Sequence, residues 1–462
     1  MPPKYGARAI AVLAAAIVLA YYFFFTWKSL GIFFDRDDMM NLYVAWSKPL
    51  GELLLSNVLY WTDSARPLGE LWYRTIFFVA GFDPLPFHVA LLSLGVVNLA
   101  LCAWFVKLVS DSARVVAFTA ILFAFQTRLM EVWFRTAVIY DALCFTFFYL
   151  AACLYLAARK REQNPGPGQS ALITASFILA LDAKEIAVAL PAVLILYELL
   201  FHRLRWKNMV LPGILGLLTL PYIAAKTLGA KALTANPYYQ PEYSLSRFLE
   251  RWSEYLGFLF VRPLPVSHRA VAALLILPLL VALLLRSRQL IFAWAILFVT
   301  TLPVAFLPYR GGFVLFISWA GWTLFAALLG NQLISLVKDP QHRAFAAAAL
   351  FILLGWRAGK INLHDQRTGD REWLYGDARV VETLAKQLDA LQPEFPRGAR
   401  FLFAEDGFGT DEWTPVFILR LLNEDATLVV DRVKMMDPKP ATQDGYRYVF
   451  TYENGKYRRL RP

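Results

Sequence analysis

The sequence predicts an α-helical polytopic membrane protein that ends in a small α/β domain. Of its 462 residues, 58% are hydrophobic and only 18% are charged, and the mean hydropathy is +0.47. The hydrophobic residues gather in long runs, and this pattern gives way to a mixed composition after residue 357. A soluble chain of this length could not bury so much apolar surface, so the composition excludes an ordinary soluble enzyme.

A membrane-spanning helix needs about 20 predominantly apolar residues, and by that rule we expect about eleven spans. The first run follows Lys4 and Arg8 and continues through aromatic residues without a small-residue cleavage site, so it predicts an uncleaved span rather than a signal peptide. The predicted spans lie near residues 9–30, 85–106, 115–127, 136–158, 170–182, 185–201, 209–228, 268–285, 290–307, 313–337 and 344–357.

Short loops rich in Lys and Arg occur at every second boundary between these runs, for example at Lys107/Arg114, 159–161 and Arg286/Arg288. The positive-inside rule predicts that such loops are cytoplasmic. The N-terminus is then cytoplasmic and the C-terminal domain extracytoplasmic, in the plasma (inner) membrane if the host is bacterial. Basic loops and anionic lipid account for the net charge of +11, so the lipid bilayer is a predicted partner and nucleic acid is not.

Two outer loops, 31–84 and 229–267, are long and have helix-like apolar spacing; in the first we expect two helices along the membrane surface. They belong to the predicted membrane domain, residues 1–357. Residues 358–462 form the predicted α/β domain. Its expected helices are 376–392 and 414–423, and the segments 399–406, 426–432 and 446–460 are its expected strands.

Carboxylates recur in several outer segments at the edges of spans, and cations accompany them. A charge at membrane depth costs about 2.5–3.5 kcal/mol, so these residues are expected to face a cavity or a partner. An anionic substrate in that cavity would explain the cations. The acidic residues are Asp35, Asp37, Asp38, Glu131, Asp141, Asp182 and Glu185, and the cations include Arg66, Lys184 and Arg310.

The segment FDRDDMMNLY, residues 34–43, carries the sharpest signal. Adjacent carboxylates repel, so Asp37 or Asp38 can hold a raised pKa and act as a base near neutral pH. A metal-binding role stays open, although no metal-ligand spacing indicates one and no cofactor is predicted. The plainer interpretation is a solvated acidic loop, or a helix start with Asp35 as its cap.

Several short motifs occur in a definite order in the first half of the chain. They are Asp37-Asp38, Arg66-Pro67-Leu68, Gly81-x-Asp83-Pro84 with His88, Glu131-Val-Trp133, Asp141, and Lys184-Glu185 with Tyr197-Glu198. In this order, over residues 30–205, the chain resembles the GT-C superfamily of polytopic glycosyltransferases. Within it, the chain is most similar to the transmembrane O-mannosyltransferases with tetratricopeptide repeats and their bacterial relatives. It departs from them at Gln126-Thr127 and Ala183, where that family has His-Pro and Ser, and it lacks the repeats.

The resemblance implies an inverting transfer of a hexose or pentose from a polyprenyl-phosphate donor to a hydroxyl-bearing acceptor at the outer face of the membrane. It implies that Asp37 is the base and that Asp38 orients either Asp37 or the acceptor. Glu131 and Asp141 would form a second acidic element, and Lys184 and Arg66 would bind the donor phosphate. Glu185 and Asp35 would support them. Arg310, in a tight outer turn, is a further candidate for the phosphate. The sugar and the acceptor stay open.

Two other classes of function remain. One is a transporter or flippase of lipid-linked sugars, and the other is a non-catalytic membrane assembly protein. The sequence has no half-repeat symmetry of the kind that transporter folds often show. The acidic pair also lies in a surface loop rather than at mid-span, which favours catalysis. Replacing Asp37 with Ala would abolish turnover in an enzyme and leave binding intact in the other two classes.

Overall fold

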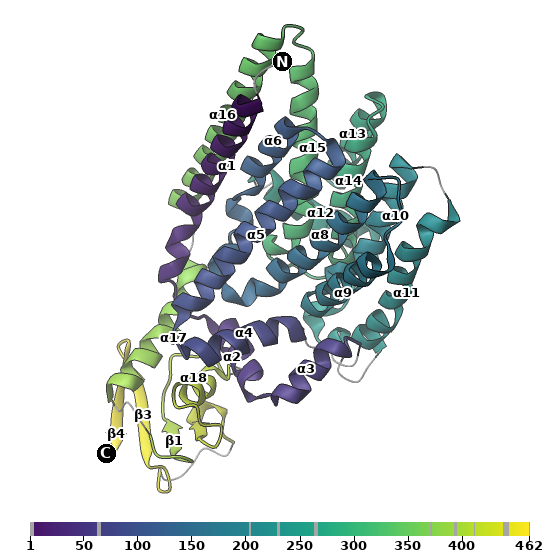
Figure 1. Cartoon of the computed structure of the whole chain (residues 1–462). Coiled ribbons are helices and arrows are strands. Elements are labelled where there is room, and N and C mark those ends of the chain that lie inside the picture. Colours follow the sequence, from purple (N-terminus) through teal and green to yellow (C-terminus); the bar gives the residue numbers. More distant parts are fainter. Residues whose placement is uncertain are drawn as a thin grey trace.

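A bundle of helices forms the larger part of the molecule, and a small unit with a β-sheet lies at one end of it (Figure 1). The N-terminus lies at the opposite end of the bundle from the sheet. The computed structural model describes residues 4–61, 66–202, 205–228, 232–262, 267–369, 372–391, 395–410, 412–437 and 443–461.

Each hydrophobic run that predicts a span contains a helix. These helices are α1 (Lys4–Thr26), α5 (Pro84–Ser110), α6 (Ala113–Phe123), α8 (Ile139–Lys160), α9 (Pro167–Ala183), α10 (Leu190–Phe201), α11 (Trp206–Leu228), α13 (His268–Leu284), α14 (Arg288–Thr301), α15 (Phe316–Ser335) and α16 (Pro340–Thr368). Among the described residues, 6 helical stretches are long and apolar enough to cross a membrane. The chain is therefore a multi-pass membrane protein, and the number of about eleven spans stays a prediction.

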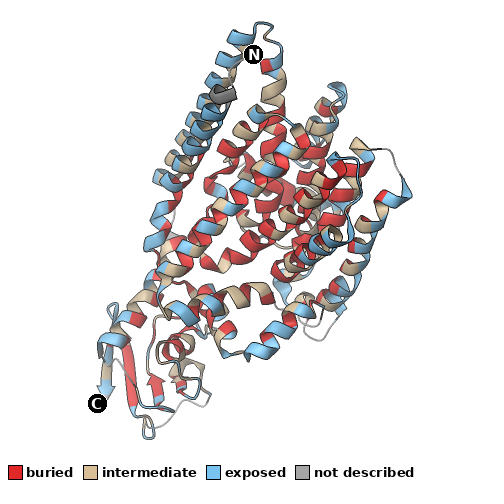
Figure 2. Cartoon of the chain, in the orientation of Figure 1, coloured by how far each residue is buried: buried red, intermediate tan, exposed pale blue. Residues whose placement is uncertain are grey.

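Burial separates the inner helices of the bundle from the outer ones (Figure 2). The apolar stretches that contain α8 and α15 are 78% buried, whereas those of α1 and α16 are 22% and 0% buried. Large apolar side chains such as Leu13 on α1 and Trp356 on α16 are exposed. A soluble protein rarely exposes apolar surface of this extent, so these helices have the surface expected of helices that face lipid.

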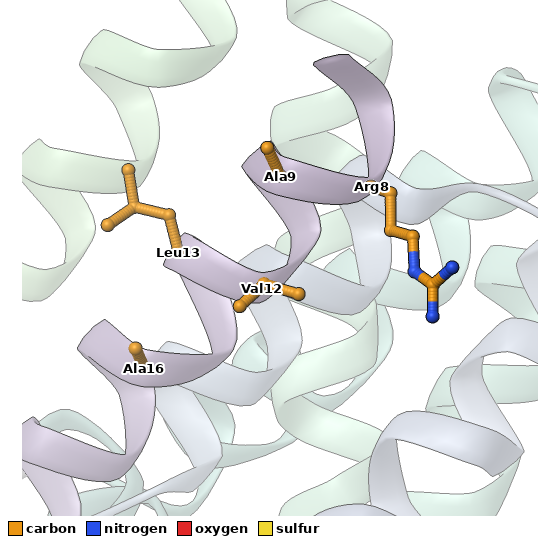
Figure 3. A pocket seen from close by; sticks show the side chains of 5 residues that line it. All are labelled: Arg8, Ala9, Val12, Leu13 and Ala16. Carbon is orange, nitrogen blue, oxygen red and sulfur yellow. The ribbon is translucent and has the colours of Figure 1, made fainter. Parts of the chain in front are cut away.

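Two apolar hollows lie on this outer surface. One is formed by α1 alone, between Arg8 and Ala16 (Figure 3). The other lies on α16 between Phe345 and Trp356. Apart from Arg8, the side chains that line them are apolar. Neither hollow contains any of the predicted site residues, and both fit the packing of lipid chains better than the binding of a charged substrate.

The first outer loop forms a layer of helices across the end of the bundle that faces the sheet (Figure 1). Its described part contains three helices rather than the expected two: α2 (Arg36–Ser47), α3 (Leu50–Val58) and α4 (Pro67–Ala80). Helices α2 and α3 are separated at Pro49, which takes the N-cap position of α3, because proline has no backbone N–H with which to continue a helix. The second outer loop contributes α12 (Leu245–Phe260). Residues 62–65, 229–231 and 263–266 of these loops lie outside the described residues.

The C-terminal unit comprises α17 (Glu372–Leu391), β1 (Arg400–Phe403), α18 (Thr414–Leu422), β2 (Val429–Arg432), β3 (Tyr448–Glu453) and β4 (Lys456–Arg461). Within the described residues its sheet has the order β2-β1-β3-β4. Strand β1 is parallel to β2 and β3, and β4 is antiparallel to β3. The β3–β4 hairpin turns at Asn454 and Gly455, which both have positive φ angles, as a tight two-residue turn requires.

Candidate active site

The N-terminus of α2 is closed by two of the predicted carboxylates. The Asp35 side chain accepts a hydrogen bond of 2.9 Å from the Asp38 backbone N–H, and the Asp38 side chain accepts one of 2.9 Å from the Asp35 backbone N–H. This reciprocal pair is a capping box. The interpretation of Asp35 as a helix cap is therefore confirmed. The positive end of the helix dipole also favours the negative charges gathered here.

Asp38 is enclosed, with only 2% of its surface exposed. Its Oδ1 atom accepts hydrogen bonds from the Tyr73 hydroxyl at 2.9 Å and from the Thr136 hydroxyl at 2.6 Å. Burial, together with the charge of Asp35, raises the pKa of Asp38 to about 8. Both of its oxygens are engaged within the protein, so Asp38 is suited to fixing α2 and not to contacting a substrate.

Asp37 differs from its neighbour, because 62% of its side chain is exposed. Its Oδ2 atom accepts a hydrogen bond of 2.8 Å from Nη2 of Arg135. Partial enclosure and the charge of Asp35 raise the pKa of Asp37, and Arg135 opposes this effect. Asp37 is thus the member of the acidic pair that an incoming molecule can reach.

Arg135 joins the carboxylates into one group. Its Nε atom lies 2.5 Å from Asp35 and its Nη1 atom 3.1 Å from Glu131, in addition to the contact with Asp37. We call Asp35, Asp37, Glu131 and Arg135 the acidic cluster. One cation faces three carboxylates, so the cluster keeps an excess of negative charge.

Arg135 was not among the predicted site residues, although it belongs to the outer segment 128–135. The spacing of Glu131 and Arg135 offered a signal, because residues four apart on a helix are neighbours. Their i,i+4 ion pair is present in the structure. Burial, partly offset by Arg135, raises the pKa of Glu131.

The remaining predicted residues form a second group around the start of α8. Lys184 contacts Asp141 at 2.5 Å, with 8% and 4% of their side chains exposed. Arg66 donates two hydrogen bonds of 3.0 Å to the Glu185 carboxylate. Two of the three cations predicted to bind the donor phosphate therefore already have a carboxylate partner within the protein.

Arg310 completes this second group, which we call the cation cluster: Arg66, Lys184, Arg310, Asp141, Glu185 and Tyr239. Its Nη2 atom donates a hydrogen bond of 2.8 Å to the Tyr239 hydroxyl, and its guanidinium lies 4.4 Å from the centre of that ring. The Arg66 guanidinium lies 5.9 Å from the same ring. Burial alone would raise the pKa of Tyr239, but Arg66 and Arg310 together lower it. Within the described part of the chain, no carboxylate forms an ion pair with Arg310.

A short segment between Gly311 and Phe313 separates the two clusters and touches both. A Cβ atom added to Gly311 would lie 2.5 Å from an oxygen of Glu131 in the acidic cluster. The Lys184 ammonium of the cation cluster lies 4.7 Å from the centre of the Phe313 ring. The structure thus brings all the predicted site residues into one region. They form the acidic cluster, with Asp38 hydrogen-bonded to Asp35 beside it, and the adjoining cation cluster.

Metal binding at the acidic cluster finds no support in the geometry. In the described ranges, no group of three or more His, Cys, Asp or Glu side chains has an arrangement that could hold a metal ion. The Arg135 guanidinium occupies the position between the three carboxylates that a cation would need.

Comparison with known proteins identifies the fold. No protein-family model and no curated protein sequence matches the chain. The crystal structure of ArnT from Cupriavidus metallidurans in the apo state matches with a TM-score of 0.52 and 15% sequence identity, over 92% of this chain and 90% of that chain. ArnT from the same organism bound to undecaprenyl phosphate matches with a TM-score of 0.49 and 15% identity, over 98% and 97% of the two chains.

The apo comparison shows that this chain shares the fold of ArnT, which is a polytopic GT-C glycosyltransferase. The resemblance inferred from the sequence is therefore confirmed at the level of the fold. It also extends further than the motifs, which cover residues 30–205, because the structural match includes most of the chain.

Proposed function

We propose that the chain is an inverting glycosyltransferase that moves a sugar from a polyprenyl-phosphate donor to a hydroxyl-bearing acceptor. The observation that carries this proposal is the placement of an exposed carboxylate, Asp37, in a cluster that adjoins a second cluster of cations. Glycosyl transfer from a lipid phosphate needs a base for the acceptor and positive charge for the leaving phosphate. The GT-C fold supports the same reaction class.

Asp37 is the proposed base. Its Oδ2 atom is held by Arg135, and no described residue donates a hydrogen bond to its Oδ1 atom, so one oxygen is free to accept a proton from an acceptor hydroxyl. The acceptor oxygen then attacks the anomeric carbon from the face opposite the phosphate. The bond from that carbon to the phosphate oxygen breaks, and the polyprenyl phosphate leaves with the electron pair. Attack from the opposite face inverts the anomeric configuration.

Arg310 is the first candidate for the donor phosphate. Unlike Lys184 and Arg66, it has no carboxylate partner among the described residues, and its tyrosine partner leaves its positive charge uncompensated. A guanidinium binds phosphate through strong charge-assisted hydrogen bonds. Lys184 and Arg66 would contribute to the positive potential of the pocket, and direct contact with the phosphate would require them to loosen their pairs with Asp141 and Glu185.

The placement of charge along the bundle supports catalysis at the outer face of the membrane. Near the far end of α8, Lys160 contacts Asp111, which also pairs with Lys107. The 22 residues of α8 separate this basic end from the acidic cluster by about 33 Å, close to the thickness of a bilayer core. By the positive-inside rule the basic end is cytoplasmic and the C-terminal unit extracytoplasmic. In a bacterial host this is the inner membrane.

Reconstitution in liposomes with a series of radiolabelled polyprenyl-phosphate sugars tests the proposal. A membrane lipid and glycan extract serves as the source of acceptors, and Asp37→Asn is the matched variant. A glycosyltransferase releases polyprenyl phosphate and transfers the label in the wild type alone. A flippase moves the intact donor across the bilayer without cleaving it, and an assembly protein does neither; either of these results would refute the proposal.

A further inference from the structure

Helix α2, which carries the acidic pair, lies between the bundle and the C-terminal unit (Figure 1). On the bundle side it is held at both ends. Asp38 contacts Tyr73 of α4 and Thr136. Near the C-terminus of α2, Arg74 donates hydrogen bonds to the carbonyl oxygens of Ala45, Trp46 and Lys48. Basic groups at this end of a helix satisfy its terminal carbonyls.

The C-terminal unit holds α2 at two points. Arg36 and Tyr43 are seven residues apart, which is about two helical turns, so they lie on the same face. The Arg36 guanidinium contacts Asp377 of α17 at 3.2 Å and also the carboxylate of Glu412. The Tyr43 ring stacks on Phe417 of α18 with 4.6 Å between ring centres.

A second residue of α18 also contacts Tyr43. The Arg420 side chain of α18 donates a hydrogen bond of 2.6 Å to the Tyr43 hydroxyl. The contacts at Arg36 and Tyr43 therefore join α2 to two different helices of the C-terminal unit. Helix α2 cannot shift or rotate about its axis without breaking one of them.

A buried network fixes the segment that contacts Arg36. Only 1% of the Arg432 side chain is exposed, and it donates hydrogen bonds of 2.8 and 2.7 Å to the carboxylate of Asp406. It also donates to the backbone carbonyls of Gly409 and Glu412. The Phe408 ring from this segment lies 5.9 Å from the Arg36 guanidinium. Arg432 thus holds the backbone of Glu412, the residue that contacts α2.

The position of Arg36 gives these contacts a chemical consequence. Arg36 lies between Asp35 and Asp37 in the chain. Because Glu412 and Asp377 bind its guanidinium, Arg36 takes no part in the acidic cluster, and Arg135 is the one described cation that forms an ion pair with Asp37. An Arg36 side chain released from Glu412 is close enough in the chain to compete for Asp37 and neutralise it.

We propose that the C-terminal unit is a positioning element for the reaction. By binding Arg36 through Glu412 and Asp377, it fixes the N-terminus of α2 and keeps Asp37 available to the acceptor. Arg36 is a positioning residue in this scheme and does not touch the substrate. The expected effect on kcat rests on the proposed function, whereas the expected loosening of α2 does not.

Glu412→Gln tests this inference, with Glu382→Gln as the matched control. The control removes the same charge from the same unit, but Glu382 pairs with Lys386 on the exposed face of α17 and does not contact α2. Hydrogen–deuterium exchange of the peptide that covers residues 36–47 is measured in full-length protein, together with kcat and the KM values for donor and acceptor.

We expect Glu412→Gln to speed amide exchange in residues 36–47 by about fivefold, since a held helix opens more readily when one contact is lost. We also expect kcat to fall about tenfold or more, as for a displaced catalytic group, while the donor KM and the melting temperature change little. Glu382→Gln should change none of these. The Arg36→Lys variant, which keeps the charge, should recover part of the activity that Arg36→Gln loses.

Three results would overturn the inference. One is unchanged exchange in residues 36–47. Another is faster exchange with an unchanged kcat. The third is a rise in acceptor KM alone, which would mean that the unit selects the acceptor. If the wild type transfers no sugar at all, the proposed function fails, and the exchange data alone decide whether Glu412 holds α2.

Discussion

Arg135 donates a hydrogen bond of 2.8 Å to Asp37, a residue 98 positions away in the chain. The same guanidinium binds Asp35 and Glu131, so a single cation holds three carboxylates near the end of the helical bundle. This arrangement makes Arg135 the residue on which the geometry of the acidic cluster depends.

Replacing Arg135 with Gln should lower the stability of the protein strongly. The change leaves Asp35 and Glu131 buried without their cation, and breaking such a pair costs about 3–5 kcal/mol. Arg128→Gln is the control, because Arg128 forms one ion pair, with Asp365, and 40% of its side chain is exposed. That change should cost about 1 kcal/mol or less. Thermal unfolding in detergent measures both, and equal melting temperatures for the two variants would refute the role of Arg135.

Stability should fall as the pH rises because of Asp38. Its pKa in the folded protein is about 8, whereas in the unfolded chain it is about 3.9. Between these values the folded state holds a proton that the unfolded state has lost, so raising the pH favours unfolding. Asp38→Asn removes this dependence, although it also removes hydrogen bonds at every pH. As the pH rises from about 5 to about 7 (about one unit inside each limit), the melting temperature of the wild type should therefore fall relative to that of the variant. Parallel curves would contradict the assignment.

Arg310 and Lys184 should respond differently to loss of charge. Arg310→Gln removes a cation that has no carboxylate partner in the described structure, so the donor KM should rise about tenfold, the effect of one hydrogen bond to a charged group. Lys184→Gln leaves Asp141 buried without its partner, so it should lower the melting temperature. Steady-state kinetics and thermal unfolding of both variants make the comparison. A donor KM that is unchanged in Arg310→Gln would exclude that residue from the phosphate site.

Gly311→Ala should disturb the boundary between the two clusters. The added Cβ would lie 2.5 Å from Oε1 of Glu131 and 2.8 Å from the Phe313 ring, so the carboxylate must move. We expect kcat to fall about tenfold or more, since small displacements in an active site are costly. Gly31→Ala is the control, because an added Cβ there meets nothing within 4 Å. Equal activity of the two variants would show that the position of Glu131 does not matter for the reaction.

Much of the site could be predicted because membrane topology restricts where loops can lie. The motifs around Asp37, Arg66 and Glu131 are far apart in the chain, but the alternation of spans sends their loops to one end of the bundle. The two helices after residue 372 and the strands β1 and β2 were also predictable, from an amphipathic pattern and from short apolar runs between turn residues. The expected strand segment 446–460 is instead two strands, β3 and β4, joined by the turn at Asn454 and Gly455.

The pairing of charges could not be predicted in the same way. Lys184 and Glu185 are adjacent, but Lys184 has an extended backbone (φ −162°, ψ 149°). Successive side chains in an extended segment point to opposite sides. Lys184 therefore binds Asp141, while Glu185 binds Arg66. Only the three-dimensional packing decides such partners.

Helix α16 extends beyond the predicted span at its C-terminal end. The hydrophobic run predicts a helix near 344–357, but the helix continues to Thr368. Its polar extension is held by long-range contacts. Asn362 accepts a hydrogen bond from the Thr127 backbone, and Asp365 binds Arg128. A hydropathy pattern detects the apolar part of a helix and not a polar continuation that packs on a distant loop.

The assignment of Asp37 as the base is tested by the single-turnover rate of sugar transfer in Asp37→Asn beside the wild type, with donor binding measured on the same preparations. Asn keeps the shape of the side chain but cannot accept the proton. We expect a rate that is about 100-fold to 10,000-fold lower, with donor affinity unchanged within about twofold because Asp37 does not bind the phosphate. A variant that transfers sugar at the wild-type rate would show that Asp37 is not the base.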